Sequence, residues 1–93
     1  MNGPNEFVEF KNVNGKLDAG VNSNVANMLR YLTEKRTGSL DLMINPNTGM
    51  TQQLKRLIAR AQGRGVEVTI VRAVMDDAGN IVSTTVVRLA DIS

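Results

Sequence analysis

The chain of 93 residues contains no cysteine and no histidine. Without cysteine no disulfide framework forms, and cysteine usage gives no indication of the redox compartment. Without histidine there is no Ser-His or Cys-His nucleophilic pair, no histidine general base and none of the common zinc sites. Any catalysis must therefore use carboxylates, lysine, arginine, tyrosine or hydroxyl groups, with or without a hard cation bound through oxygen atoms.

Aromatic residues and long apolar runs are also scarce. One tyrosine and two phenylalanines argue against a base-stacking platform for single-stranded nucleic acid. No apolar segment approaches the length of a membrane span, and the polar N-terminus does not have the form of a signal peptide, so we expect no membrane partner. The length suits a single domain, 1–93, with one modest core, and we expect residues 1–5 to form a flexible tail.

The charged residues are balanced in number, with a net charge of +2. This charge is too small to indicate nucleic-acid binding by itself, so the distribution of the charges matters more. Arg56, Arg60 and Arg64 recur every four residues and form a basic stripe along a predicted helix. Such a stripe suits either a phosphate backbone or an ordinary solvated helix face. Arg56, Arg60 and Lys16 are our candidate contacts to nucleic acid.

Hydrophobic periodicity predicts the element order β-α-β-α-β-β. Residues 16–22 alternate weakly, and we predict a loop there rather than a short strand. Val21 is expected on the buried face of the first helix. Strands that alternate with helices predict a small α/β domain with a mixed, largely parallel sheet, right-handed crossovers and a terminal antiparallel hairpin. The predicted strands cover about 6–13, 39–44, 66–75 and 81–89, and the predicted helices about 24–35 and 51–62.

The first predicted strand carries the main candidate site. Because side chains alternate along a strand, Val8 and Phe10 point to one face, and Glu9 and Lys11 point to the other. In metal-dependent nucleases a strand carboxylate binds Mg²⁺, and a lysine two residues later orients the attacking water. The same Glu-x-Lys spacing also arises from an exposed ion pair, which contributes less than about 1 kcal/mol. The spacing alone is compatible with both.

A complete site of this kind needs at least one more carboxylate. Glu6 is too close to Glu9 in the chain to serve. Asp41 on the neighbouring predicted strand and Asp18 in the following loop are the remaining candidates. We take Asp41 as the second ligand of Mg²⁺ or Mn²⁺. The loop at 45–49 precedes a helix N-terminus, which favours anions, but it lacks the pattern of a phosphate-binding loop.

In their order along the chain, these segments resemble a known family. The first strand (FVEFKNV, 7–13), the GKL that follows at 15–17, an amphipathic helix and an apolar strand resemble the C-terminal half of restriction-endonuclease-like toxin domains. These domains occur at the ends of bacterial contact-dependent and Rhs-type polymorphic toxins. The later stretches INPNTGMTQQL (44–54) and VTIVR (68–72) are similar to their loop, second helix and next strand. The resemblance spans about residues 6–73.

The resemblance implies a PD-(D/E)xK nuclease core, in which Glu9 matches the metal-ligand acid and Lys11 the catalytic lysine. The helix after this motif often presents a glutamine in the family, and Asn24 is the nearest candidate here. The resemblance further implies Mg²⁺ or Mn²⁺, a nucleic-acid substrate and an immunity protein as partner. It also implies a location in the cytoplasm, or delivery into a target cell within a larger secreted toxin.

The helix and strands that carry the family's Asp ligand have no counterpart here, so the chain is expected to be a fragment or a reduced, inactive relative. This absence supports a second interpretation, a non-catalytic protein-interaction domain on the same scaffold. Its first strand would present an unpaired edge, which invites a homodimer or another partner chain. A third interpretation, nucleic-acid binding without chemistry, predicts salt-dependent affinity without metal dependence.

Overall fold

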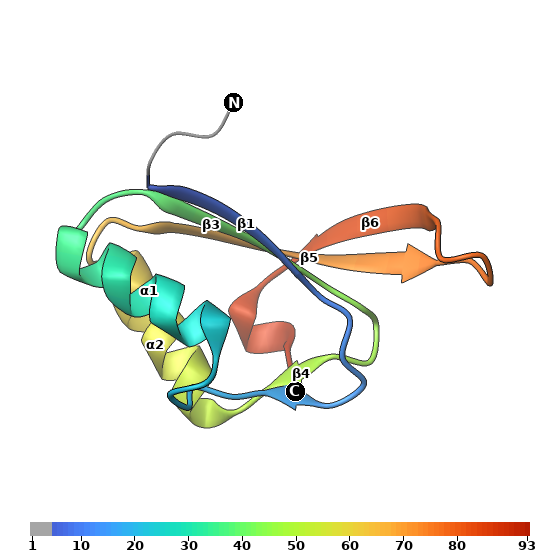
Figure 1. Cartoon of the computed structure of the whole chain (residues 1–93), viewed down its shortest axis with the longest axis horizontal. Coiled ribbons are helices and arrows are strands. Elements are labelled where there is room, and N and C mark those ends of the chain that lie inside the picture. Colours follow the sequence, from blue (N-terminus) through green and yellow to red (C-terminus); the bar gives the residue numbers. More distant parts are fainter. Residues whose placement is uncertain (1–4) are drawn as a thin grey trace.

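The computed structural model describes residues 5–93 (Figure 1). Within that range the chain forms six strands, two α-helices and one short 3₁₀ helix. In chain order they are β1 (Glu6–Lys11), β2 (Lys16–Leu17), α1 (Asn24–Lys35), β3 (Ser39–Ile44), β4 (Gly49–Met50), α2 (Gln52–Gly63), β5 (Glu67–Met75), β6 (Ile81–Val87) and η1 (Leu89–Asp91).

The main sheet has four strands in the order β1-β3-β5-β6. The first three are parallel, and β6 runs antiparallel to β5. A small mixed α/β domain with a four-stranded sheet and two helices is therefore confirmed. The predicted order of elements is incomplete, because β2 and β4 form a separate parallel pair of two residues each. Residues 16–17 lack a local strand signal, since their partner lies more than thirty residues away at 49–50.

Both helices lie on one face of the sheet (Figure 1). The central strand β3 directs Leu40, Leu42 and Ile44 into the core, where each side chain is 0% exposed. Val21, which we expected to be buried, is 85% exposed, because it precedes the helix and its cap. The helices contribute the remaining central residues of the core, Val25, Ala26, Leu29 and Leu32 from α1 and Leu54, Ile58 and Ala61 from α2.

Hydroxyl groups cap the N-termini of both helices. Ser23 Oγ accepts the N–H of Ala26 at 3.1 Å, and Thr51 Oγ1 accepts the N–H of Leu54 at 3.3 Å. Each bond satisfies one of the four N–H groups that a helix leaves without a partner at its start. These caps fix the residues at which α1 and α2 begin, and therefore fix where the loops before them end.

The last residues of the chain complete the core. After β6 the chain turns through η1, and Ile92 is only 1% exposed among the buried side chains of the core. The backbone oxygen of Ser93 accepts the N–H of Met50 at 2.9 Å, which ties this segment to β4. We predicted the last strand to continue to residue 89, whereas β6 ends at Val87.

The predicted flexible tail falls mostly outside the described residues, at 1–4. Asn5 belongs to the fold, because its backbone oxygen accepts the N–H of Ser39 at 2.9 Å and its side chain contacts the Tyr31 hydroxyl. Neither helix of the described chain is long and apolar enough to cross a membrane.

Gly38 offers a sharp test of this packing. Its φ is 100°, a conformation that side chains disfavour, and a Cβ there would collide with the backbone oxygen of Asn5 and a methyl group of Leu32. We expect Gly38→Ala to lower the free energy of unfolding by about 1–3 kcal/mol in urea titrations followed by circular dichroism.

Gly63→Ala is the matched control. Gly63 ends α2, has no atom within 4 Å of its added Cβ and needs no positive φ. Its stability should equal or exceed that of the wild type. Equal losses in both variants would contradict the steric account of Gly38.

Candidate functional site

The strand β1 has two chemically different faces. In the parallel register Glu9 lies beside Leu42, and Lys11 lies beside Ile44. Both partners belong to the core, so Glu9 and Lys11 project from the face that the helices cover. Val8 and Phe10 are 61% and 42% exposed on the opposite face. The predicted division of this strand into two faces is confirmed, with the charged pair on the inner side.

Glu9 and Lys11 form an ion pair across one strand repeat. Lys11 Nζ lies 3.3 Å from Glu9 Oε1, and each side chain is 26% exposed. The pair is thus partly shielded from solvent rather than fully solvated. Because both side chains are held against the sheet, the position of the lysine ammonium is constrained by the neighbouring carboxylate.

A cavity of about 300 Å³ opens where β1 ends and α1 begins. Three of the predicted site residues, Lys11, Lys16 and Asn24, line it together with Asp18 and Ser23. Open α/β sheets bind ligands at this place, outside the carboxyl ends of parallel strands. The N-terminus of α1 adds a partial positive charge. The cavity combines two ammonium groups, a carboxylate and two side-chain amides, which is a suitable lining for a phosphate group.

The register places Asp41 and Glu9 on opposite faces of the main sheet. Asp41 pairs with Val8, not with Glu9, and therefore lies on the open face of the sheet. Glu9 lies on the covered face, and a difference of one residue in register reverses the face on which a side chain lies. The structure therefore does not bring Asp41 together with Glu9, and Asp41 as a metal ligand stays a prediction.

Asp18 is the carboxylate that lines the same cavity as Lys11. Its Oδ1 accepts the N–H of Gly20 at 3.2 Å, which holds the carboxylate in the turn before α1. Residues 5–93 contain no cluster of three or more Asp, Glu, His or Cys side chains. Mg²⁺ commonly takes one or two protein carboxylates and completes its shell with water and substrate phosphates. Asp18 lines the cavity, and Glu9 is linked to it through the ion pair with Lys11.

A hydrogen-bonded network joins the loops next to the site. Asn45 Nδ2 donates to Asn12 Oδ1 at 2.8 Å and to Asn14 Oδ1 at 3.1 Å. Thr48 Oγ1 donates to the Val13 oxygen at 2.7 Å and accepts the N–H of Asn45 at 3.1 Å. These bonds join the loop after β1 to the loop after β3. The loop that brings Lys16 to the cavity is therefore held by side chains from a distant segment.

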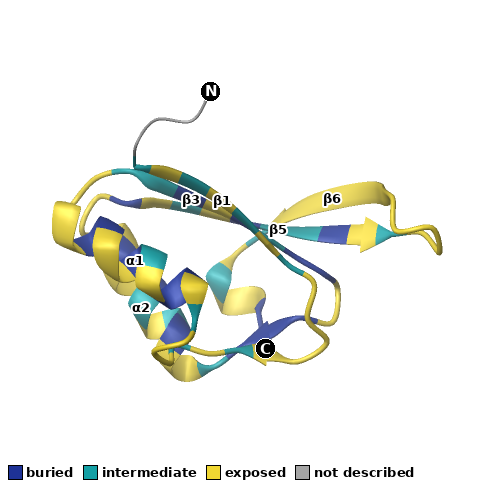
Figure 2. Cartoon of the chain, in the orientation of Figure 1, coloured by how far each residue is buried: buried dark blue, intermediate teal, exposed yellow. Residues whose placement is uncertain are grey.

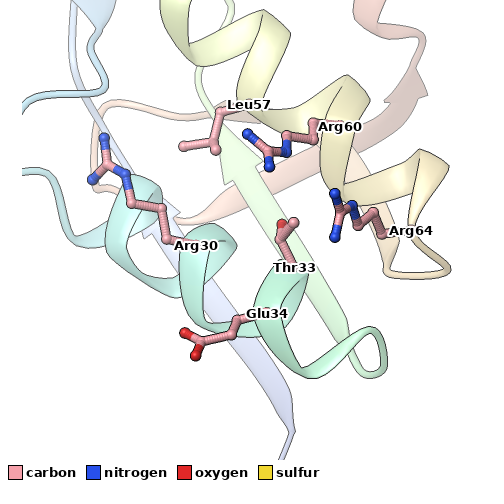
Figure 3. A pocket seen from close by; sticks show the side chains of 6 residues that line it. All are labelled: Arg30, Thr33, Glu34, Leu57, Arg60 and Arg64. Atoms are coloured by element: carbon pink, nitrogen blue, oxygen red, sulfur yellow. The ribbon is translucent and has the colours of Figure 1, made fainter.

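The other predicted nucleic-acid contacts lie on α2. Arg56 and Arg60 are exposed and line a second cavity of about 310 Å³ between the helices. Arg30 of α1 lines it as well, and its guanidinium donates to the Ala19 oxygen at 2.6 Å and to Asn27 Oδ1 at 3.1 Å. We did not predict Arg30, because it lies on a different helix from the basic stripe. Figure 3 shows Arg60 and Arg64 extending from α2 toward α1.

Comparisons with family models, with curated proteins and with solved structures give no significant match. The chemistry of the residues around the cavity and the resemblance of the sequence segments are the two indications of function.

Thr48 provides a test of the network that supports the site. The hydroxyl of Thr48 makes two hydrogen bonds, and the residue is 1% exposed. Thr48→Val keeps the shape of the side chain but leaves the Val13 oxygen and the Asn45 N–H without this partner. We expect the free energy of unfolding to fall by about 1–3 kcal/mol in thermal and urea unfolding.

Thr84→Val is the control, because Thr84 is an exposed residue of β6 for which no side-chain hydrogen bond is seen in the described chain. Unchanged stability of Thr48→Val would contradict the role that we assign to the network.

Proposed function

We propose that this chain carries the Glu-x-Lys part of a metal-dependent endonuclease site that hydrolyses phosphodiester bonds in nucleic acid. One observation supports this above all. The Glu9–Lys11 pair lies on the covered face of β1, and Lys11 shares a cavity with Lys16, Asp18 and Asn24. An ordinary surface ion pair does not require a neighbouring cavity lined by further charged and amide side chains. The proposal agrees with the resemblance to restriction-endonuclease-like toxin domains.

Glu9 and four residues that line the cavity have roles in this proposal. Lys11 donates hydrogen bonds to the attacking water and to a phosphate oxygen, and it offsets the negative charge that develops there. Glu9 and Asp18 are the carboxylates that would hold Mg²⁺ or Mn²⁺, and the ion would stabilise charge on the phosphate. Lys16 and the side-chain amide of Asn24 orient the phosphate at the start of α1.

The basic side of the molecule supplies affinity. Arg56 and Arg60 are exposed, and neither forms an ion pair with a carboxylate in the part of the chain that the structure describes. Their charge is therefore available to phosphates, whose neutralisation releases bound counterions. The proposal includes the toxin context of the resemblance, namely an immunity protein as inhibitor and delivery within a larger secreted protein.

Cleavage of plasmid DNA and of total RNA in Mg²⁺ or Mn²⁺ tests the proposal. We expect activity that EDTA abolishes and that Lys11→Ala and Glu9→Gln each reduce by about 10²-fold or more. Asp41→Asn is the matched acidic control, because its carboxylate lies on the other face of the sheet. Lys55→Ala is the matched basic control on α2, outside the lining of the Lys11 cavity. Both controls should keep wild-type activity.

Two results would contradict the proposal. No cleavage by folded wild-type protein would show that this chain has no nuclease activity of its own. Cleavage that survives both Glu9→Gln and Lys11→Ala would place the activity elsewhere or in a contaminant.

A second candidate function, a non-catalytic interaction domain, is favoured by the open face of the sheet. Phe10, Met43, Val71 and Val86 stand side by side in register across all four strands of the main sheet. No helix covers them (Figure 2), and Val86 is 70% exposed. A contiguous apolar row of this kind marks an interaction surface. In this function a second copy of the chain covers the row, and the outer edge of β1 adds to the contact.

Sedimentation velocity tests this second function. A dimer of the wild type should dissociate in Val86→Lys, because a buried lysine at the contact lacks a partner. Thr85→Lys is the control. Thr85 precedes Val86 in β6, and its side chain points to the opposite face of the sheet. A wild type that stays monomeric at high concentration would contradict self-association through this row.

A further inference from the structure

The cavities on the helix side of the molecule form a series. The Lys11 cavity has a volume of about 300 Å³, and the next cavity, around the turn before α1, about 320 Å³. Two more, of about 310 Å³ and 290 Å³, follow along the seam between α1 and α2.

Neighbouring members of this series share lining residues. Asp18 lines both the Lys11 cavity and the cavity at the turn. Ala19 and Gln53 line both the cavity at the turn and the next one along the helices. Arg30 and Arg60 line both of the last two cavities. Because adjacent cavities share lining residues, we treat the four as one surface, which we call the helix groove. It runs from Lys11 to Arg64 near the end of α2.

The helix groove is strongly basic. Its acidic lining residues are Asp18 and Glu34, and its cationic lining residues are six: Lys11, Lys16, Arg30, Arg56, Arg60 and Arg64. In residues 5–93 the ion pairs are Lys11–Glu9 and Arg88–Asp91, so none of the groove arginines is paired with a carboxylate. Arg30 is held by neutral acceptors, which orient its guanidinium without neutralising it.

We propose that the helix groove binds the backbone of one strand of nucleic acid and leads it to the Glu9–Lys11 site. This inference rests on the proposed function and names its substrate geometry. Arg56 and Arg60 are four residues apart on α2, a rise of about 6 Å along the helix, and Arg64 follows four residues later at the C-cap. That step is close to the separation of successive phosphates along one extended strand.

The lining also determines how the strand lies. No aromatic side chain lines any of the four cavities, so the groove offers nothing on which bases stack. The phosphates therefore face the arginines, and the bases face solvent. Binding of this kind is independent of sequence and depends steeply on salt.

Fluorescence anisotropy of labelled single-stranded oligonucleotides in EDTA measures this binding separately from cleavage. We expect Arg60→Gln/Arg64→Gln to reduce the slope of log K against log salt by about 1.4, two phosphate contacts on a single strand. Lys35→Gln/Arg88→Gln removes the same charge outside the groove and should leave the slope unchanged. Oligonucleotides of different sequence should bind equally, and a duplex of the same length should bind no more tightly.

Equal effects of the two double variants, wild-type binding by Arg60→Gln/Arg64→Gln, or tighter binding of the duplex would overturn the groove. These outcomes are distinct from failure of the nuclease proposal. Salt-dependent binding without metal-dependent cleavage would support the groove proposal and contradict the nuclease proposal. Cleavage that needs Lys11 but not Arg60 and Arg64 would support the nuclease proposal and contradict the groove proposal.

Photo-crosslinking tests whether the groove reaches the site. The chain has no cysteine, so a single introduced cysteine carries the crosslinker without background. Asn24→Cys at the Lys11 cavity and Gln53→Cys at mid-groove should both crosslink to a bound single strand. Ser83→Cys on β6, outside the groove lining, should not. Crosslinking from position 53 without crosslinking from position 24 would overturn the connection to the site.

Discussion

The handedness of the two crossovers is the constraint on which this molecule depends. The strands β1, β3 and β5 are parallel and follow one another across the sheet in chain order. Crossovers between parallel strands are right-handed, so two successive crossovers in the same direction place both helices on the same face. The core is therefore built between one sheet face and the two helices, with Leu40, Leu42 and Ile44 of β3 at its centre.

This one-sided arrangement gives the two faces of the sheet different chemistry. On the covered side, α1 and α2 pack against each other, and their outer surfaces meet in a seam lined by arginines from both helices. Lys11 lines one cavity with the first residues of α1, and Glu9 is paired with it. On the open side, an apolar row crosses all four strands of the main sheet without a helix above it. Catalysis and nucleic-acid binding are thus proposed for one side, and association for the other.

The carboxyl ends of the parallel strands are where the parts of the site meet. The chain leaves β1 and β3 through loops that are tied together by Asn45 and Thr48. Arg72 of β5 reinforces the second loop, since its Nη1 donates to the backbone oxygens of Asn45 and Thr48 at 2.9 Å and 3.1 Å. Through these bonds, polar groups of the two loops are hydrogen-bonded within the protein. The charged groups Lys11, Lys16 and Asp18 line the neighbouring cavity.

Sequence by itself determined the features that depend on near neighbours in the chain. Helical periodicity located α1, and alternation put Glu9 and Lys11 on one face of β1. Only the tertiary structure decided which acid shares a cavity with Lys11, because the register between β1 and β3 puts Asp41 on the other face of the sheet, while a turn brings Asp18 to the cavity. The tertiary structure likewise places Arg30 of α1 in the same cavity as Arg56 and Arg60 of α2. Such relations depend on contacts between distant segments, and no local pattern encodes them.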